Sequence, residues 1–229
     1  AIGNVVVSPS EFMPRLFAEN GRLLDSQGRI TLDTPEALRA LENYRETYSY
    51  SDRTIYDFWK NALEGFADGT AAMTVVFINY ASHILNSQMS RIAGKLGFAP
   101  VPGGKPLLGG GVIGIAQSCT CPAAACKFLE WLYADLVAPV FTMLGGLSPC
   151  RSAYSNRDIS EQYPWLSTAR KSFPTAQRRS NSTYYQNFSE LQLETILAAY
   201  VQQAVLGVCS PEEALKQAQE DCNRYFQPW

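Results

Sequence analysis

Cysteine residues supply the spacing in this sequence that comes nearest to a metal-binding motif. Cys119, Cys121 and Cys126 lie close together, and the sequence holds one histidine, His83, far from them in a helical pattern. Structural zinc needs four ligands, usually at paired C-x2-C or Cys/His spacings. We therefore expect no metal site. The cysteines are free thiols or form one or two disulfides whose pairing the sequence leaves open, and they are Cys119, Cys121, Cys126, Cys150, Cys209 and Cys222.

Glycines at 109, 111 and 114 spell the G-x-G-x-x-G pattern of dinucleotide-binding turns. That pattern indicates a dinucleotide site only where it links a strand directly to a helix. Here Gly114 lies inside a predicted strand that is followed by a loop rich in Cys and Pro. We expect no dinucleotide site and no cofactor.

Catalytic groups in useful combinations are also scarce. A Ser-His-Asp triad would depend on His83, which has Ile84 and Leu85 beside it at a helical position. The cysteines have no neighbouring base that could activate a thiolate. The paired carboxylates Glu212-Glu213 and Glu220-Asp221 fall on predicted solvated helix surfaces. We do not expect an enzyme.

The composition is that of a soluble globular protein. Of the 229 residues, 46% are hydrophobic and 17% charged, with a formal net charge of −2. A nucleic-acid partner is not expected, because polyanion binding needs clustered Lys and Arg in excess. No apolar run approaches the roughly 20 residues that cross a bilayer. The chain begins at Ala1 rather than Met, so we expect a processed or trimmed piece whose targeting signal lies upstream.

The sequence contains clear signals for where helices begin and end. Asp33-Thr34-Pro35 is a strong helix start, and Asn20-Gly21 can end the helix before it. Caps and apolar periodicity predict helices at 8–20, from 33, and at 56–67, 79–89, 122–133, 184–206 and 210–226.

Strand signals are shorter and fewer. Residues 71–78 form an apolar run rich in β-branched side chains, which predicts a buried strand. Shorter strands are predicted at 97–104 and 112–117, and a hairpin with a Gln-Gly turn at 23–32. Residues 145–182 read as loop with short helical pieces. Short strands alternating with longer helices predict an α/β architecture.

Six segments together resemble the family 1 extracellular solute-binding proteins, which include the maltose-binding protein. Phe66-Ala67-Asp68-Gly69-Thr70-Ala71-Ala72-Met73 is similar to the family's F-x-x-G-x-A-A-M element between a helix and a strand. The other five segments lie at 20–37, 97–104, 108–115, 123–132 and 210–215, and all six occur along the chain in the family's order. They are mostly caps, turns and core strands, so they indicate the fold more strongly than the ligand.

The resemblance implies a lobe of the type II periplasmic-binding-protein fold. It is expected to be mostly helical, with a short mixed sheet, and to lack most of the first lobe. Residues 1–114 and 176–229 would form the second lobe. Residues 115–175 would pack on the first lobe, as they do in complete members.

The resemblance also implies binding residues, because carbohydrate binders stack aromatic rings on sugars and bond their hydroxyls with polar groups. After the A-A-M strand, Phe77 or Tyr80 would stack and Asn79 would bond a hydroxyl. The alternative places Phe77 in the core and Tyr80 in the first turn of a helix. A second ring would be Tyr184 or Tyr185, one of which must point away because neighbours in a helix face different directions.

Two further segments match ligand-facing positions of the family. Ser10 and Glu11 lie at a helix N-terminus whose N–H groups and carboxylate could bind hydroxyls, or that could be a plain cap. Gly110 and Gly111 follow, and many members carry Trp where Gly111 stands. Its absence leaves room for a bulkier ligand.

The resemblance thus predicts the solute-binding component of an ABC importer. It would capture a small polar solute, expected to be a carbohydrate, reversibly by closure of two lobes. The ABC permease subunits would be its partners, and the binding protein itself would be a monomer. It would work outside the cytoplasm, in the periplasm or at the cell surface, anchored by lipid. The alternative is a ligand-sensing regulatory domain that uses the same lobe.

Overall fold

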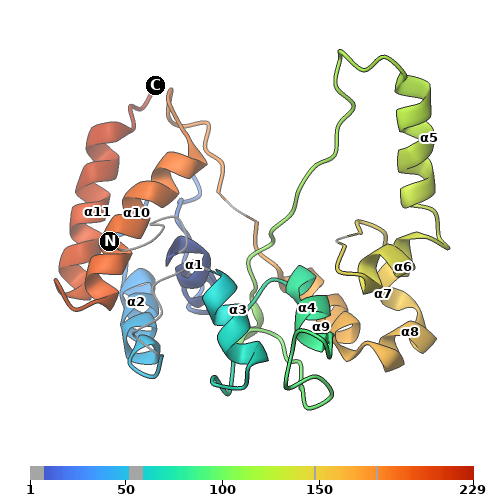
Figure 1. Ribbon diagram of the computed structural model, residues 1–229. Coiled ribbons are helices and arrows are strands. Elements are labelled where there is room, and N and C mark those ends of the chain that lie inside the picture. Colours follow the sequence, from blue (N-terminus) through green and yellow to red (C-terminus); the bar gives the residue numbers. More distant parts are fainter. Residues whose placement is uncertain (1–7, 52–58, 147, 179) are drawn as a thin grey trace. The chain divides into compact units, whose positions relative to one another are not determined.

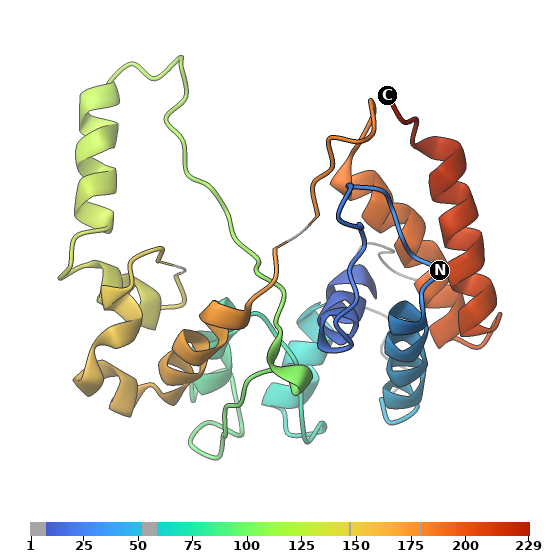
Figure 2. The ribbon, with the colours of Figure 1, turned by 180° about the vertical axis from the view of Figure 1, so that it is seen from behind.

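The computed structural model describes residues 8–51, 59–146, 148–178 and 180–229, which fall into two compact units (Figures 1 and 2). Unit 1 comprises Ala1–Phe58, Val101–Leu108 and Thr175–Trp229. Unit 2 comprises Trp59–Pro100 and Gly109–Pro174. This division into units does not test whether residues 115–175 pack on another lobe, which stays a prediction.

Unit 1 is built around four helices. They are α1 (Ser8–Ala18), α2 (Pro35–Tyr48), α10 (Glu190–Val205) and α11 (Pro211–Tyr225). Helix α10 packs against α11, α1 and α2, and the short 3-10 helix η2 (Pro102–Gly104) packs against α1 (Figure 1). The largest side chains buried between them include Phe12, Met13, Leu16, Leu41, Leu193, Leu197, Leu215 and Phe226.

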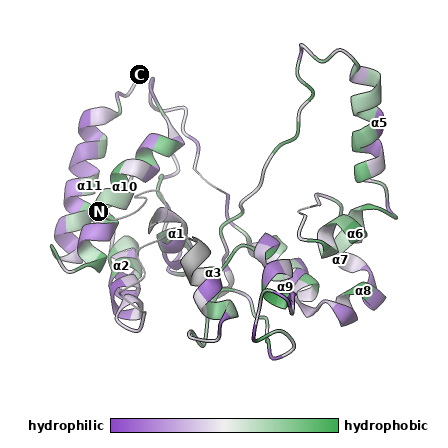
Figure 3. Ribbon diagram, viewed as in Figure 1, coloured by the Kyte–Doolittle hydropathy of each residue, from purple (hydrophilic) through white to green (hydrophobic). Residues whose placement is uncertain are grey.

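Hydroxyl caps fix where these helices begin. The Thr34 hydroxyl accepts from the Ala37 amide at 3.2 Å, and the Ser210 hydroxyl accepts from Glu213 at 3.1 Å. Proline occupies the first turn after each cap, where no amide donor is needed. Figure 3 shows hydrophilic residues over much of α11, whose apolar side faces the core of unit 1. The predicted starts of α2 and α11 are confirmed.

The predicted hairpin is present as a tight excursion between α1 and α2. Leu24 and Ile30 form an isolated antiparallel bridge, and Gly28 turns the chain with a φ of 81°. This left-handed conformation favours glycine. The Asp25 carboxylate accepts from the amides of Gln27 and Arg29 at 2.8 and 2.9 Å, so the loop holds its own turn.

Other strand pairing is sparse in the described residues. Leu107 pairs with Gln177 in a parallel bridge, and Tyr185 pairs with Pro228 in an antiparallel one. The expected short mixed sheet is therefore represented by three isolated bridges, parallel and antiparallel, all within unit 1.

Unit 2 consists of short helices around a second core. They are α3 (Trp59–Ala67), η1 (Ile78–Tyr80), α4 (Ala81–Leu85), α5 (Pro122–Leu132), α6 (Ala138–Met143), α7 (Ser152–Ser155), α8 (Arg157–Gln162) and α9 (Pro164–Ser172). The 3-10 turn η3 (Phe173–Thr175) follows α9. We name the second core cluster core 2; its buried members are Ala81, Ala138, Ala153, Tyr154, Trp165, Leu166 and Ala169.

The strands predicted for unit 2 are wrong. Residues 71–77 and 112–117 have irregular backbone, and Met73 and Val112 expose 87% and 100% of their surface. Residues 97–104 likewise end in η2 rather than in a strand. β-branched runs favour extended backbone, but a strand also needs a neighbour that accepts and donates its ladder bonds. No bridge joins any of these segments in the part of the chain that the structure describes.

Two predicted helices differ in their bounds. The helix expected at 79–89 is the turn η1 followed by α4, which ends at Leu85. The helix expected from Tyr184 begins at Glu190, because the Ser189 hydroxyl caps it by accepting from Gln192 at 3.3 Å. Of the helix predicted at 56–67, residues 56–58 lie outside the described residues, and the remainder is α3.

Candidate functional site

Ser10 and Glu11 lie in the first turn of α1, which is anchored by the buried Phe12 and Met13. Glu11 leaves 39% of its side chain exposed, and its carboxylate forms an ion pair with Arg15 at 3.4 Å. Both interpretations of this segment therefore stay open: an anchored helix start, and an accessible carboxylate that could bond a hydroxyl.

Arg15 ties this helix start to α2. Its Nη1 donates to the Glu11 carbonyl at 2.6 Å and its Nη2 donates to the Thr47 hydroxyl at 3.2 Å. The guanidinium carbon lies 4.4 Å from the centroid of the Tyr44 ring, a cation–π contact. Burial, helped by the negative charge of Glu11, raises the pKa of Tyr44 well above its usual range, so its phenol stays neutral. No sequence motif pointed to this cluster.

The predicted ligand turn of unit 2 runs from Phe77 through η1 into α4. Phe77, Asn79 and Tyr80 are all half-buried, so neither ring is a fully buried core residue. The Phe77 ring lies against Gly109, where an added Cβ would come within 3.0 Å of Cε1. The Asn79 carbonyl accepts from the Ser82 hydroxyl at 3.4 Å, which closes the turn. Phe77 is thereby brought next to the glycine segment that also carries a sequence prediction.

The glycine segment itself is open. Gly110 and Gly111 are exposed, and a Cβ added to either would meet no atom within 4 Å. That this space receives a bulky ligand stays a prediction. Beyond Gly114 the chain runs irregularly to α5 at Pro122 rather than turning directly into a helix.

The Tyr184–Tyr185 pair divides into one accessible ring and one core ring. Tyr184 is 37% exposed, whereas Tyr185 is 9% exposed and packs near Phe188 and Phe226. The two tyrosine rings meet edge to face with centroids 5.0 Å apart. Tyr184 is therefore the more exposed ring of the pair, and the binding role of either ring stays a prediction.

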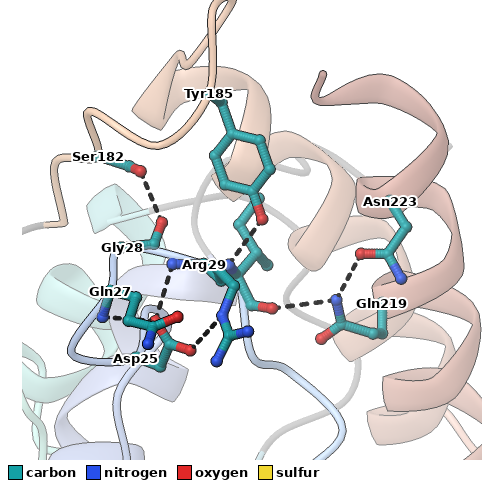
Figure 4. Close-up of polar contacts among 9 residues, drawn as sticks. Asp25, Gln27, Gly28, Arg29, Ser182, Tyr185, Gln219 and Asn223 are labelled. Carbon is teal, nitrogen blue, oxygen red and sulfur yellow. Dashed lines mark hydrogen bonds and ion pairs between the residues drawn. The ribbon is translucent and has the colours of Figure 1, made fainter. Parts of the chain in front are cut away.

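A network of polar contacts holds Tyr184 and Tyr185 against the hairpin (Figure 4). The Ser182 hydroxyl donates to the Gly28 carbonyl at 2.6 Å. It also accepts from the Tyr184 amide at 3.1 Å. From α11, Gln219 donates to the Ile30 carbonyl at 3.1 Å (Figure 4). The Ser182 bonds thus tie the backbone of Tyr184 to the hairpin, and the Gln219 bond ties the hairpin to α11.

An ion pair lies on the outer side of the same hairpin. Arg29 Nε donates to Asp25 Oδ2 at 2.7 Å (Figure 4). The backbone amide of Arg29, followed by its guanidinium, lowers the pKa of Asp25 below its usual value. Asp25 is thus an ionised anchor of the turn.

The predicted site residues are distributed over both units. Ser10, Glu11, Tyr184 and Tyr185 belong to unit 1, while Phe77, Asn79, Tyr80, Gly110 and Gly111 belong to unit 2. Within unit 2, the Phe77 ring lies against Gly109, the residue before Gly110. Within unit 1, the described hydrogen bonds and ring contacts do not join Glu11 to Tyr184.

The cysteines are free thiols in this structure. Cys222 is buried on α11, and burial raises the pKa of its thiol to about 12. Among the described residues, no three His, Cys, Asp or Glu side chains are grouped so as to hold a metal ion. The described helices also include none with the length and apolar character needed to span a membrane.

Trp165 is a residue that the sequence predictions missed. It lies in α9, inside the stretch predicted to be mostly loop, and is 2% exposed. The available signal was Pro164 at a helix start, followed by Trp165, Leu166 and Ala169 at helical spacing on one face.

Solved structures with the same fold bind sugars and polyols. Maltose-bound MalE3 of T. maritima is similar at a TM-score of 0.79 and 23% identity, over 94% of this chain and 56% of that one. A ribitol-bound ABC-transporter solute-binding protein of Agrobacterium radiobacter gives a TM-score of 0.72 at 21% identity, over 96% and 57%. A tagatose-bound protein of Thermotoga lettingae gives 0.69 at 24% identity, over 96% and 57%. The chain therefore spans a little more than half the length of these structures.

The sequence itself matches one protein family over most of its length. Residues 8–168 match the bacterial extracellular solute-binding protein family. The matched range includes α1 with Ser10 and Glu11, the Phe77–Tyr80 turn and the glycine segment. The chain belongs to the bacterial extracellular solute-binding protein family.

Proposed function

We propose that this protein is the solute-binding component of an ABC importer and captures a small carbohydrate or polyol. The family match over residues 8–168 carries the proposal. The maltose, ribitol and tagatose held by similar structures support the chemical class of the solute. Capture is reversible and involves no chemical change, metal or cofactor.

Accessible rings and polar groups give the proposal its residues. Tyr184 offers a half-exposed ring on a rigid backbone, and Phe77 or Tyr80 offers a second ring from unit 2. Asn79 in unit 2 and Glu11 in unit 1 supply hydrogen-bonding groups for hydroxyls, and Ser10 precedes Glu11 in α1. Tyr185 acts from the core, as the ring against which Tyr184 packs. Gly110 and Gly111, which follow the Gly109 that Phe77 contacts, leave open space for a ring of the solute.

The binding lobe consists of residues 1–114 and 176–229, and residues 115–175 pack on the other lobe. Exposed apolar side chains support this assignment. Phe128 and Trp131 on α5 are 55% and 56% exposed, and Leu136 beyond it is 88% exposed. Large apolar side chains gathered in one region are typical of a surface that another element covers.

Transport places the protein outside the cytoplasm, in the periplasm or at the cell surface, with a lipid anchor. It works as a monomer that delivers solute to the permease subunits of the transporter. Closure of two lobes is favoured because the solute contacts both.

Calorimetry with the protein at its full natural length tests the proposal. We expect at least one of maltose, ribitol, mannitol and tagatose to bind. Asn79→Ala should weaken that binding, whereas Asn43→Ala, an exposed site on α2, should leave it unchanged. No detectable binding of any of the four compounds, or equal affinity in both variants, would contradict the proposal.

A further inference from the structure

The indole N–H of Trp165 is a buried donor for which the described residues supply no acceptor. Trp165 is 2% exposed in α9, and its Nε1 atom is buried without a hydrogen bond. The large majority of buried side-chain polar atoms in proteins are hydrogen-bonded, because leaving one unpaired costs its full desolvation penalty. Trp has a single polar atom, so this side chain has no other way to be satisfied.

Other buried polar side chains of unit 2 are paired. The Tyr154 hydroxyl donates to the Ser148 carbonyl at 3.0 Å, and the Thr142 hydroxyl donates to the Ala138 carbonyl at 2.9 Å. The hydroxyls of Tyr154 and Thr142 therefore find their acceptors within unit 2. The Trp165 indole stands apart from this pattern.

Arg15 in unit 1 provides a useful comparison. Its Nε is also buried without a partner, but both of its Nη atoms donate hydrogen bonds, to Glu11 and Thr47. The Arg15 guanidinium is thus satisfied as a group. The Trp165 indole is not.

Trp165 also lies beside the predicted ligand turn. Core 2 contains Ala81 as a buried member and Ile78 as a partly buried one, and these residues bracket Asn79 and Tyr80. Four of the seven buried members are alanines. The Trp165 indole is the largest side chain that α9 contributes to this cluster. The Trp165 side chain and the two residues that flank Asn79 and Tyr80 in the turn therefore pack in the same cluster, core 2.

We propose that the Trp165 indole N–H donates a hydrogen bond to an oxygen of the bound solute. This inference rests on the proposed function and adds α9, beside the Phe77–Tyr80 turn, to the part of its site that lies in unit 2. The solute must offer an acceptor, such as a hydroxyl or ring oxygen, because the indole cannot accept from an ammonium group. Its apolar ring faces suit the C–H surface of a neutral sugar or polyol.

Access to this donor requires a local movement. Because Nε1 is buried, the solute reaches it when the Ile78–Ala81 turn moves away from α9. The turn is short, and it is closed by the Tyr80 N–H bond to the Phe77 carbonyl at 3.0 Å and by the 3.4 Å bond between Ser82 and the Asn79 carbonyl, so a shift of this turn does not require a long helix to unfold.

Nuclear magnetic resonance of the indole groups tests the inference directly. The full-length protein, labelled with 15N on its tryptophans, is titrated with whichever of maltose, ribitol, mannitol and tagatose binds by calorimetry. The signal lost in Trp165→Phe identifies Trp165. We expect this signal to move on saturation, while that of Trp229, which is 84% exposed, serves as a control that keeps its position.

Affinity measurements on Trp165→Phe complete the test. Loss of one hydrogen bond should weaken binding about five- to tenfold. Leu166→Ala, a neighbouring core 2 residue without a donor, controls for loss of packing: it should lower stability more than Trp165→Phe does and affinity less.

The possible failures are distinguishable. A solute that saturates the protein while the Trp165 signal stays in place would overturn this inference and leave the proposed function standing. So would an affinity in Trp165→Phe equal to that of the unmodified protein. Absence of binding by all four compounds would overturn both.

Discussion

The backbone N–H of Ile30 donates to the hydroxyl oxygen of Tyr185 at 2.9 Å, although 155 positions separate the two residues. Both are buried, so the bond is shielded from water. It joins the early hairpin of unit 1 to the segment that leads into α10. The ring that supports Tyr184 thus also supports the hairpin.

Removing the hydroxyl of Tyr185 should destabilise unit 1. In Tyr185→Phe the Ile30 amide remains buried without an acceptor, which lowers the free energy of unfolding by about 1–3 kcal/mol. Denaturant unfolding of the two proteins measures the difference. The matched change Tyr184→Phe, at the more exposed ring, should alter stability by less than about 0.5 kcal/mol. Equal effects of the two substitutions would show that the Ile30 bond contributes nothing.

Tyr184→Ala should weaken solute binding while leaving the fold intact. We expect a loss of about tenfold in affinity, or about 1.4 kcal/mol, because the accessible ring no longer contacts the apolar face of the solute. Calorimetry with the bound sugar or polyol measures it. Tyr225→Ala is the control, since Tyr225 on α11 is also partly exposed, at 46%, but carries no predicted binding role. An unchanged affinity in Tyr184→Ala would remove this residue from the site.

Gly145→Ala should destabilise unit 2 more than Gly94→Ala does. Both glycines have positive φ, at 97° and 81°, so alanine is strained at either position. At Gly145 the added Cβ would also clash with the Ser82 hydroxyl, which would have to rotate away and give up its bond to the Asn79 carbonyl, whereas at Gly94 the Cβ would meet no atom within 4 Å. We expect the clash to add about 1–3 kcal/mol to the loss at Gly145. Equal thermal stabilities of the two variants would contradict the close approach of Gly145 to the ligand turn.

The buried thiol of Cys222 should make stability fall at alkaline pH. Burial raises its pKa to about 12 in the folded protein from the ordinary thiol value of 9.0, so the unfolded state loses this proton first. Between these values the unfolded state binds fewer protons than the folded state, and the free energy of unfolding falls as pH rises. Denaturant unfolding between about pH 9 and about pH 12 measures the slope. Cys222→Ala should show a shallower slope, and an identical slope would mean that the thiol does not contribute.

Local signals in the sequence predicted the helical framework of unit 1 well. Thr34 and Ser210 cap helices where the cap-and-proline pattern placed them, and Gly28 turns the hairpin as expected. These features depend on a few neighbouring residues, so the sequence contains their full cause. Ser189 is a further cap of this kind, and its hydroxyl explains why α10 starts later than the apolar periodicity suggested.

Features that depend on distant partners could not be predicted in the same way. The run at 71–78 has strand composition, but a strand forms only beside another strand, and the sequence does not say where one lies. The burial of Tyr185 and the exposure of Tyr184 likewise follow from contacts with the hairpin and α11. Trp165 was missed because its significance lies in the lack of an acceptor among the described residues, which is visible only in three dimensions.

The amide of Gln219 has a consequence for how the hairpin behaves in solution. Its Oε1 accepts from the Leu32 N–H at 2.6 Å and its Nε2 donates to the Ile30 carbonyl, so one side chain occupies the groups that a neighbouring strand would use. An extended edge with free donors and acceptors can recruit a second molecule and seed aggregation. Here α11 covers that edge with a glutamine, which protects the hairpin from pairing with another copy of the protein.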